Sequence, residues 1–106
     1  MDNCIFCQIV QKKSPATVHY QDEDVMVIDD THPQAPVHVM VISKKHVGEF
    51  LDAEDTLVNH MLRVVKKMIR EQKISGYRIV NNGKGAAFVD HLHIHVMGGI
   101  EKARGL

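Results

Sequence analysis

The 106-residue sequence has no excess charge of either sign, because its thirteen Lys and Arg residues are balanced by thirteen Asp and Glu residues. A neutral chain argues against electrostatic binding to nucleic acid or to a membrane surface. The sequence also lacks an apolar run of membrane-spanning length, and its polar opening MDNC does not resemble a secretory signal. Internal repeats and low-complexity segments are absent from it. We therefore expect a single cytoplasmic domain over residues 1–106, with no membrane and no nucleic-acid partner.

Cysteine is scarce as well, with only Cys4 and Cys7, in the stretch CIFC. A cytoplasmic compartment keeps thiols reduced, which disfavours a disulfide. The C-x-x-C spacing is compatible with a redox pair, with half of a tetrahedral zinc site, or with two buried, inert thiols. A redox pair usually opens a helix that follows a strand, and no strand is expected before Cys4. The spacing therefore favours zinc, with two histidines elsewhere completing the site.

The remaining patterns predict an α+β domain with a mainly antiparallel sheet. Apolar spacing in IFCQIVQKK predicts a short amphipathic helix near the N-terminus. One long helix is expected to begin with Asp52 as its N-cap and to end at Gly76. Strands are expected at 18–20, 25–29, 38–43, 77–81 and 91–96, with the first two forming a hairpin. Strands near both ends of the chain, around a central helix, are typical of α+β folds.

The stretch DHLHIHVMGG places three of the eight histidines at alternate positions: His91, His93 and His95. On a strand these side chains share one face, and the interleaved Leu92, Ile94 and Val96 share the other. We expect the apolar face to pack under the long helix. From spacing alone the three imidazoles are either metal ligands or a nucleophile with neighbours that set its tautomer.

Two further stretches carry weaker signals. RIVNNGKGAA predicts a strand followed by a glycine-containing loop, which would let main-chain N–H groups approach a phosphate. PQAPVHVMVISKKH begins its strand at His38 and ends at His46. A lone histidine at the edge of a strand is more often structural or solvated than functional, so neither residue is assigned a role by its position alone.

Taken together, these stretches resemble the histidine triad (HIT) superfamily. HLHIHV fits the pattern His-x-His-x-His-x-x, in which x is hydrophobic. The resemblance extends over nearly the whole chain, through CIFCQIVQKKSPATVHYQDEDVMVIDD, PQAPVHVMVISKKH and GYRIVNNG. The Gly-Gly after the triad resembles the histidine triad nucleotide-binding branch, in its bacterial zinc-containing form. The resemblance implies a HIT-like fold with a five-stranded, mainly antiparallel sheet, a long helix and a short N-terminal helix, which dimerises into a continuous sheet.

The resemblance also implies an activity. HIT proteins bind purine nucleotides such as AMP or an adenylate, and they hydrolyse or transfer at the α-phosphate through a nucleotidyl-histidine intermediate. His93 would be the nucleophile, and His38 and His95 would orient and assist it. The residues that match nucleotide-binding positions are Asn81 near the phosphate, Asp30 at the ribose, and Ile5, Phe6, Ile9, Ile28 and Met40 around the base.

The same resemblance assigns a structural Zn²⁺ to Cys4, Cys7, His46 and His91. The chain departs from the family in AAFVDH, because Ala87 and Phe88 replace the usual Gln and the Ser or Thr that contact the phosphate or the leaving group. This departure concerns the reaction rate and the choice of leaving group. The leading expectation is hydrolysis of purine nucleoside phosphoramidates or adenylates. The alternatives are hydrolysis of dinucleoside polyphosphates, or a nucleotide-binding zinc protein with little activity.

Overall fold

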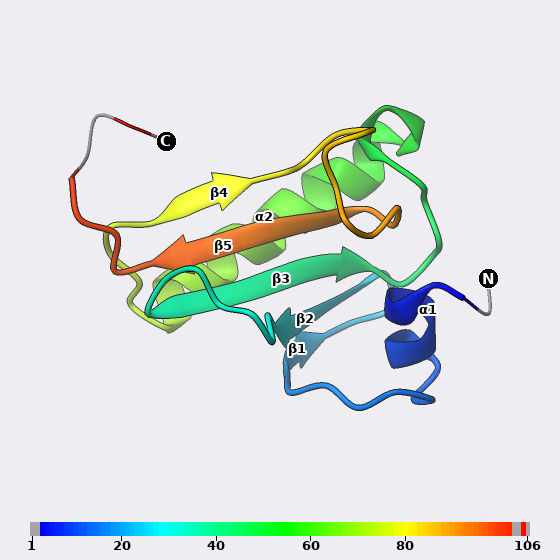
Figure 1. The fold of residues 1–106 in the computed structure, drawn as a ribbon, viewed down its shortest axis with the longest axis horizontal. Coiled ribbons are helices and arrows are strands. Elements are labelled where there is room, and N and C mark those ends of the chain that lie inside the picture. The colour runs from blue at the N-terminus through cyan, green and yellow to red at the C-terminus, as the bar shows by residue number, and fades with distance from the viewer. Residues whose placement is uncertain (1–2, 103–104, 106) are drawn as a thin grey trace.

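The structure, a computed structural model that describes residues 3–102 and 105, contains one five-stranded antiparallel sheet (Figure 1). The strands lie side by side in the order β1-β2-β3-β5-β4, and every neighbouring pair is antiparallel. Their bounds are β1 Val18–Gln21, β2 Val25–Asp29, β3 Val37–Ser43, β4 Arg78–Val80 and β5 His93–Gly98. The helices are α1 Ile5–Val10 and α2 Asp55–Glu71, with a short 3-10 helix, η1, at Phe50–Asp52. The α+β class and the antiparallel sheet predicted from the sequence are confirmed.

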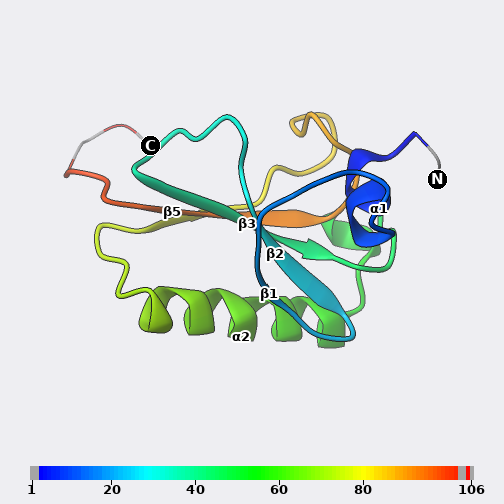
Figure 2. The same ribbon diagram turned by 90° about the horizontal axis from the view of Figure 1, so that it is seen from below.

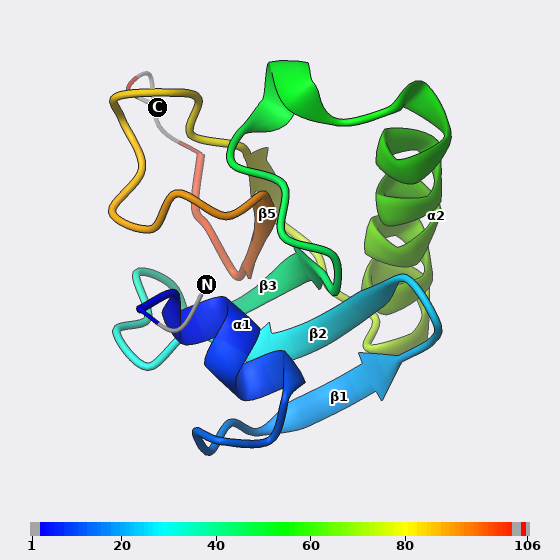
Figure 3. The same ribbon diagram turned by 90° about the vertical axis from the view of Figure 1, so that its right-hand side faces the viewer.

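The two helices lie on opposite faces of the sheet (Figures 2 and 3). Successive side chains in β2 and β3 point to opposite faces, so the apolar runs VMVI and VMVI supply both layers of the core. The layer under α2 contains these buried residues: Val25, Val27, Val39, Val41, Met61, Val64, Val65, Met68, Leu92, Ile94 and Val96. The layer on the α1 side contains Cys4, Phe6, Cys7, Met26, Ile28, Met40 and Ile42. Each fully buried aliphatic side chain stabilises the fold by about 1.5–3 kcal/mol.

Both ends of the long helix differ from the prediction. Asp52 is not the N-cap, because Phe50–Asp52 form a 3-10 turn and Glu54 precedes the first turn of α2 without a side-chain capping bond. At the other end α2 stops at Glu71, and Lys73 adopts the left-handed conformation with φ 52°. Gly76 lies beyond the helix. Glycine is required at this position because a Cβ there would lie 2.5 Å from the carbonyl oxygen of Ile100.

The strand of the histidine triad begins later than predicted. β5 starts at His93, and in its register His93 lies opposite Ile42 and His95 opposite Met40. His91 therefore precedes the strand. Within the described part of the chain, no helix combines the length and apolar character that crossing a membrane requires.

Candidate functional site

His93 and His95 lie on the α1 side of the sheet, together with His38 of the neighbouring strand β3. The ring of His93 packs edge-on against Phe6 of α1 with centroids 5.0 Å apart, and it lies 5.0 Å from the ring of His95. The interleaved Ile94 belongs instead to the core layer under α2. The predicted separation of imidazoles on one face and apolar side chains on the other therefore holds along this strand.

The tautomer of His93 follows from one hydrogen bond. Its Nδ1 lies 2.7 Å from the main-chain carbonyl oxygen of His91. Because a carbonyl oxygen can only accept, Nδ1 carries the proton and Nε2 carries the lone pair. The carbonyl of His93 itself accepts a 3.0 Å hydrogen bond from the side-chain amide of Asn81. His93 is only 6% exposed, so its ring is held in one orientation with the lone pair on Nε2.

His38 and His95 belong to a series of hydrogen bonds that begins at the main-chain N–H of Gln34. The N–H of Gln34 donates to Nδ1 of His38 at 2.9 Å, so the proton of a neutral His38 is on Nε2. That Nε2–H donates to Nδ1 of His95 at 2.8 Å. His95 is left with its proton on Nε2, which makes this atom a hydrogen-bond donor for a ligand. Burial, and then the charges of His93 and His38, lower the pKa of His95 to about 4, although Asp30 opposes the shift.

Asp30 lies against the same pair of histidines. Its Oδ2 is 3.3 Å from Nε2 of His38 and 3.7 Å from Nδ1 of His95, and its Oδ1 accepts a hydrogen bond from the N–H of His32. These three side chains are close enough together to hold a cation. However, the bond from Gln34 occupies Nδ1 of His38 and leaves the proton on Nε2, where a metal ligand needs a lone pair. The arrangement is that of a hydrogen-bond network.

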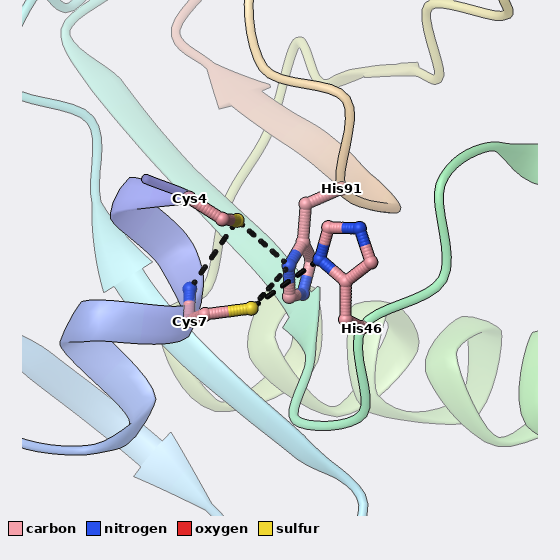
Figure 4. Close-up of side chains that lie close together, drawn as sticks. All are labelled: Cys4, Cys7, His46 and His91. Atoms are coloured by element: carbon pink, nitrogen blue, oxygen red, sulfur yellow. Dashed lines mark hydrogen bonds between the residues drawn. The ribbon is translucent and has the colours of Figure 1, made fainter. Parts of the chain in front are cut away.

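Cys4, Cys7, His46 and His91 converge at the N-terminal end of α1 (Figure 4). Cys4 is the N-cap of this helix, and its Sγ accepts a hydrogen bond from the N–H of Cys7. Nδ1 of His91 lies 3.3 Å from Sγ of Cys4 and 3.5 Å from Sγ of Cys7. Nδ1 of His46 lies 3.3 Å from Sγ of Cys7. The structure thus brings together all four residues that the family resemblance assigned to zinc; we call this group the Cys/His cluster.

The donor atoms of the Cys/His cluster fit a tetrahedral metal ion. Zinc bonds of about 2.3 Å to sulfur and about 2.0–2.1 Å to nitrogen place neighbouring ligand atoms about 3.5 Å apart. The three Sγ–Nδ1 separations of 3.3–3.5 Å agree with this value, and all four donor atoms lie within 4.8 Å of one another. Both cysteines are free thiols. Burial, together with the neighbouring thiol of Cys4, raises the pKa of Cys7, and a bound cation would reverse this preference by stabilising the thiolate.

The hydrogen bond of Nε2 in His91 leaves Nδ1 free to bind a metal ion. Its Nε2 lies 2.6 Å from the main-chain carbonyl oxygen of Ser43, so Nε2 is protonated and Nδ1 has the lone pair that faces the two sulfurs. Burial lowers the pKa of His91, because the residue is 1% exposed, and this keeps the ring neutral. The contributions of Ser43 and Gln34 were not anticipated. Both act through main-chain groups, which no pattern of side chains reveals.

The residues expected around a base are mostly part of the core. Phe6, Ile28 and Met40 are buried together on the α1 side of the sheet, and Ile9 packs against them. Ile5 is 42% exposed and stands at the surface of α1. Through Phe6, which contacts the ring of His93, this apolar group adjoins the histidines. The residues predicted to surround a base therefore lie close together, although Ile28 is almost completely buried.

The loop between β4 and β5 carries the departure noted in the sequence. Ala87 lines a small hollow together with Asn81, Val89 and His93. Phe88 beside it is fully exposed and has no burial to stabilise it. Alanine and phenylalanine side chains offer no hydrogen-bond donor, so this loop cannot supply the side-chain contacts to a phosphate that Gln and Ser would make.

Comparison with known proteins identifies the fold. A family model described as the C-terminal binding region of scavenger mRNA decapping enzymes matches residues 3–105. An uncharacterised HIT-like protein of Buchnera aphidicola is 34% identical over 105 residues, which cover 92% of each chain.

Two solved structures extend the comparison. A HIT family hydrolase of Legionella pneumophila superposes with a TM-score of 0.89 at 37% identity, over 96% of this chain and 97% of that one. A zinc-bound histidine triad family protein of Mycobacterium smegmatis gives a TM-score of 0.84 at 32% identity, over 92% of this chain and 75% of that one. With its sheet, its triad and these relatives in agreement, the chain belongs to the HIT-like family of histidine triad proteins.

Proposed function

We propose that this protein is a nucleotide hydrolase that acts at the α-phosphate of purine nucleoside phosphoramidates or related adenylates and releases a nucleoside monophosphate. The observation that carries this proposal is the tautomer of His93. Its Nδ1–H is committed to the carbonyl of His91, so a neutral ring presents the lone pair of Nε2. A neutral imidazole with a fixed lone pair is the form that attacks phosphorus.

In the first step, Nε2 of His93 attacks the α-phosphorus and forms an N–P bond. The bond from phosphorus to the nitrogen of the leaving group breaks, and this nitrogen takes a proton from solvent, so an amine departs. Because its pKa is lowered to about 4, His95 stays neutral and keeps its Nε2–H, which donates a hydrogen bond to the reacting phosphate. The hydrogen bonds from Gln34 to His38 and from His38 to His95 hold this donor in place.

In the second step, a water molecule attacks the phosphorus of the nucleotidyl-histidine. A new O–P bond forms and the N–P bond to His93 breaks, which returns the ring with its lone pair. The water gives its proton to solvent, and His38 and His95 keep the protonation that they had in the first step. Splitting one displacement into two lets an imidazole replace the weaker nucleophile, water, in breaking the original bond.

The remaining predicted residues have supporting roles in this proposal. Asn81, whose amide donates to the carbonyl of His93, would fix the strand beside the phosphate. Asp30 would accept hydrogen bonds from the ribose hydroxyls. The base would bind against α1, where Ile5 is exposed and Phe6, Ile9, Ile28 and Met40 lie beneath.

We further propose a structural zinc ion in the Cys/His cluster, supported by the fit of its donor distances and by the zinc-bound relative. Free thiols at Cys4 and Cys7 suit the reducing cytoplasm. A homodimer would pair the edge strand β4 with its copy, and this is supported by the exposure of Tyr77 and Ile79, at 56% and 43%, beside and within that strand.

A second candidate function is favoured by the β4–β5 loop. Ala87 and the fully exposed Phe88 supply no donor to a phosphate or to a leaving group. A protein with this loop could bind a purine nucleotide beside its metal and turn it over very slowly. The two functions share the nucleotide site, and they differ in whether a product appears.

The test is to incubate the purified protein with adenosine 5′-phosphoramidate and to measure AMP by liquid chromatography. Wild type should release AMP, whereas His93→Ala should not, and His32→Ala should match wild type because its ring is exposed and outside the triad network. Mass spectrometry of a quenched reaction should show wild type carrying one AMP group. Binding of AMP without any turnover would establish the second candidate. A dinucleoside polyphosphate, run in parallel, tests the alternative leaving group.

A further inference from the structure

The peptide unit between His91 and Leu92 links the Cys/His cluster to His93 through a hydrogen bond. The carbonyl of this peptide belongs to His91 and accepts the 2.7 Å hydrogen bond from Nδ1 of His93. Its N–H belongs to Leu92 and donates to the carbonyl of Val47, also at 2.7 Å. Since a peptide unit is planar and rigid, both hydrogen bonds depend on one orientation of this unit.

Two residues hold this peptide in place: His91, which belongs to the Cys/His cluster, and Val47, which follows the cluster residue His46. The ring of His91 is held on one side by the carbonyl of Ser43 and on the other by the sulfurs of Cys4 and Cys7. Val47 directly follows His46, whose Nδ1 faces Sγ of Cys7. The two histidine ligands therefore hold the peptide from its two ends.

Regular secondary structure does not fix the same peptide. β5 begins at His93, so the carbonyl of His91 lies before the first pair of its ladder, Ile42 with His93. Residues 46–48 form neither helix nor strand. The main chain on either side is held by hydrogen bonds from the N–H of His91 to the carbonyl of Val89 and from the N–H of Ser43 to the carbonyl of Leu92. The four donors of the Cys/His cluster add a side-chain restraint on where the His91 carbonyl points.

We propose that His91 is a positioning residue for His93, and that occupation of the Cys/His cluster by a metal ion sets the tautomer of His93. With Nδ1 of His91 ligated, its carbonyl holds the proton of His93 on Nδ1. Without that ligation, residues 46–48 and the 91–92 peptide loosen together. The proton of His93 then distributes between its two nitrogens, and fewer molecules present a lone pair on Nε2. The catalytic consequence rests on the nucleophilic role proposed above, whereas the structural statement does not.

The primary test is nuclear magnetic resonance of protein labelled with ¹⁵N in its histidine rings, because ring-nitrogen shifts report the tautomer directly. Spectra are compared for zinc-loaded wild type, chelated wild type, His46→Ala and His46→Cys. The Ala variant removes one ligand, whereas the Cys variant is the matched control that restores a four-donor set. Zinc-loaded wild type and His46→Cys should show His93 protonated on Nδ1. Chelated protein and His46→Ala should show a mixture, and kcat should fall roughly 10- to 100-fold, as when an outer hydrogen-bond partner is lost.

If folded, metal-free protein keeps His93 fully protonated on Nδ1, the proposal is wrong. If removal of the metal unfolds the chain, exchange of Zn²⁺ for the larger Cd²⁺ in folded protein gives the decisive measurement. The Nδ1–H resonance of His93 should then move while the Nε2–H resonances of His38 and His95 stay in place; an unmoved His93 resonance would overturn the proposal. None of these spectra requires a substrate. A protein with no phosphoramidase activity but a metal-dependent tautomer would refute only the proposed function.

Discussion

Replacing His95 by Gln should make the stability of the fold less sensitive to acid. Burial first, and then the charges of His93 and His38, lower the pKa of His95 from 6.5 to about 4, with Asp30 opposing them. Between these two values the unfolded chain binds a proton at position 95 and the folded chain does not. Stability therefore decreases as the pH falls from 6.5 to about 4, and it is unaffected by this residue above that range.

The size of the effect follows from the same two values. At about 1.4 kcal/mol for each pH unit, the interval corresponds to a loss of about 3.5 kcal/mol once the pH is below 4. The side chain of His95 is only 16% exposed, so screening by solvent is slight. Gln at this position keeps an oxygen that can accept the hydrogen bond from His38, and it cannot be protonated in this range.

The measurement is urea-induced unfolding at pH 7 and pH 4.5 for wild type, His95→Gln and the exposed-site control His32→Gln. Wild type and the control should lose about 2.5 kcal/mol more than His95→Gln between the two conditions. Acid also protonates the Cys/His cluster, but it does so in all three proteins, and this contribution cancels in the comparison. Equal losses in wild type and His95→Gln would refute the reasoning.

Three further changes test other parts of the molecule. Burial raises the pKa of Asp22, but four hydrogen bonds outweigh it and bring the value to about 2. Asp22→Asn should therefore cost about 1–3 kcal/mol at pH 7. In urea unfolding, this loss of stability should become smaller as the pH falls from 3.8 toward 2. The control Asp24→Asn should change the stability little at either pH. Ile79→Glu, on the exposed edge strand, should convert a dimer into monomers in size-exclusion light scattering. Ala87→Gln combined with Phe88→Ser should raise kcat for the phosphoramidate, and it should change stability by no more than about 0.5 kcal/mol because Phe88 is fully exposed.

The sequence predicts those parts of the fold in which the period of a pattern determines the structure. The alternation of Ile94 and Val96 with histidines fixes which side of β5 faces the long helix, since a shift of one residue would bury the imidazoles under α2. The spacing of apolar residues likewise predicts α2 itself. The predicted ends of α2 were wrong because the real ends depend on local turns. These are the 3-10 turn at Phe50–Asp52 and, at the other end, Lys73 in the left-handed conformation that glycine usually adopts.

For the candidate site, the sequence predicts which residues lie together but not how they are protonated. The residues of the Cys/His cluster, and His38 beside His95, were assigned by resemblance and lie together in the structure. Their protonation could not be predicted, because it is set by the main-chain groups of Gln34, Ser43 and His91. Every residue has such groups. Only the folded register shows which carbonyl or N–H faces which ring.

These main-chain partners explain how three equally spaced histidines can have three different chemistries. His91 donates from Nε2 to a carbonyl, so its lone pair is on Nδ1 and faces the cysteine sulfurs. His93 donates from Nδ1 to a carbonyl, so its lone pair is on Nε2. His95 accepts at Nδ1, so Nε2 carries the proton and can donate a hydrogen bond. In the proposed function a metal ligand, a nucleophile and a hydrogen-bond donor thus follow one another, the first just before β5 and the other two within it. The order depends on which ring nitrogen is engaged, by a main-chain carbonyl in His91 and His93 and by the side chain of His38 in His95. A change at His91 is therefore expected to reach His93 through the hydrogen bond to the His91 carbonyl.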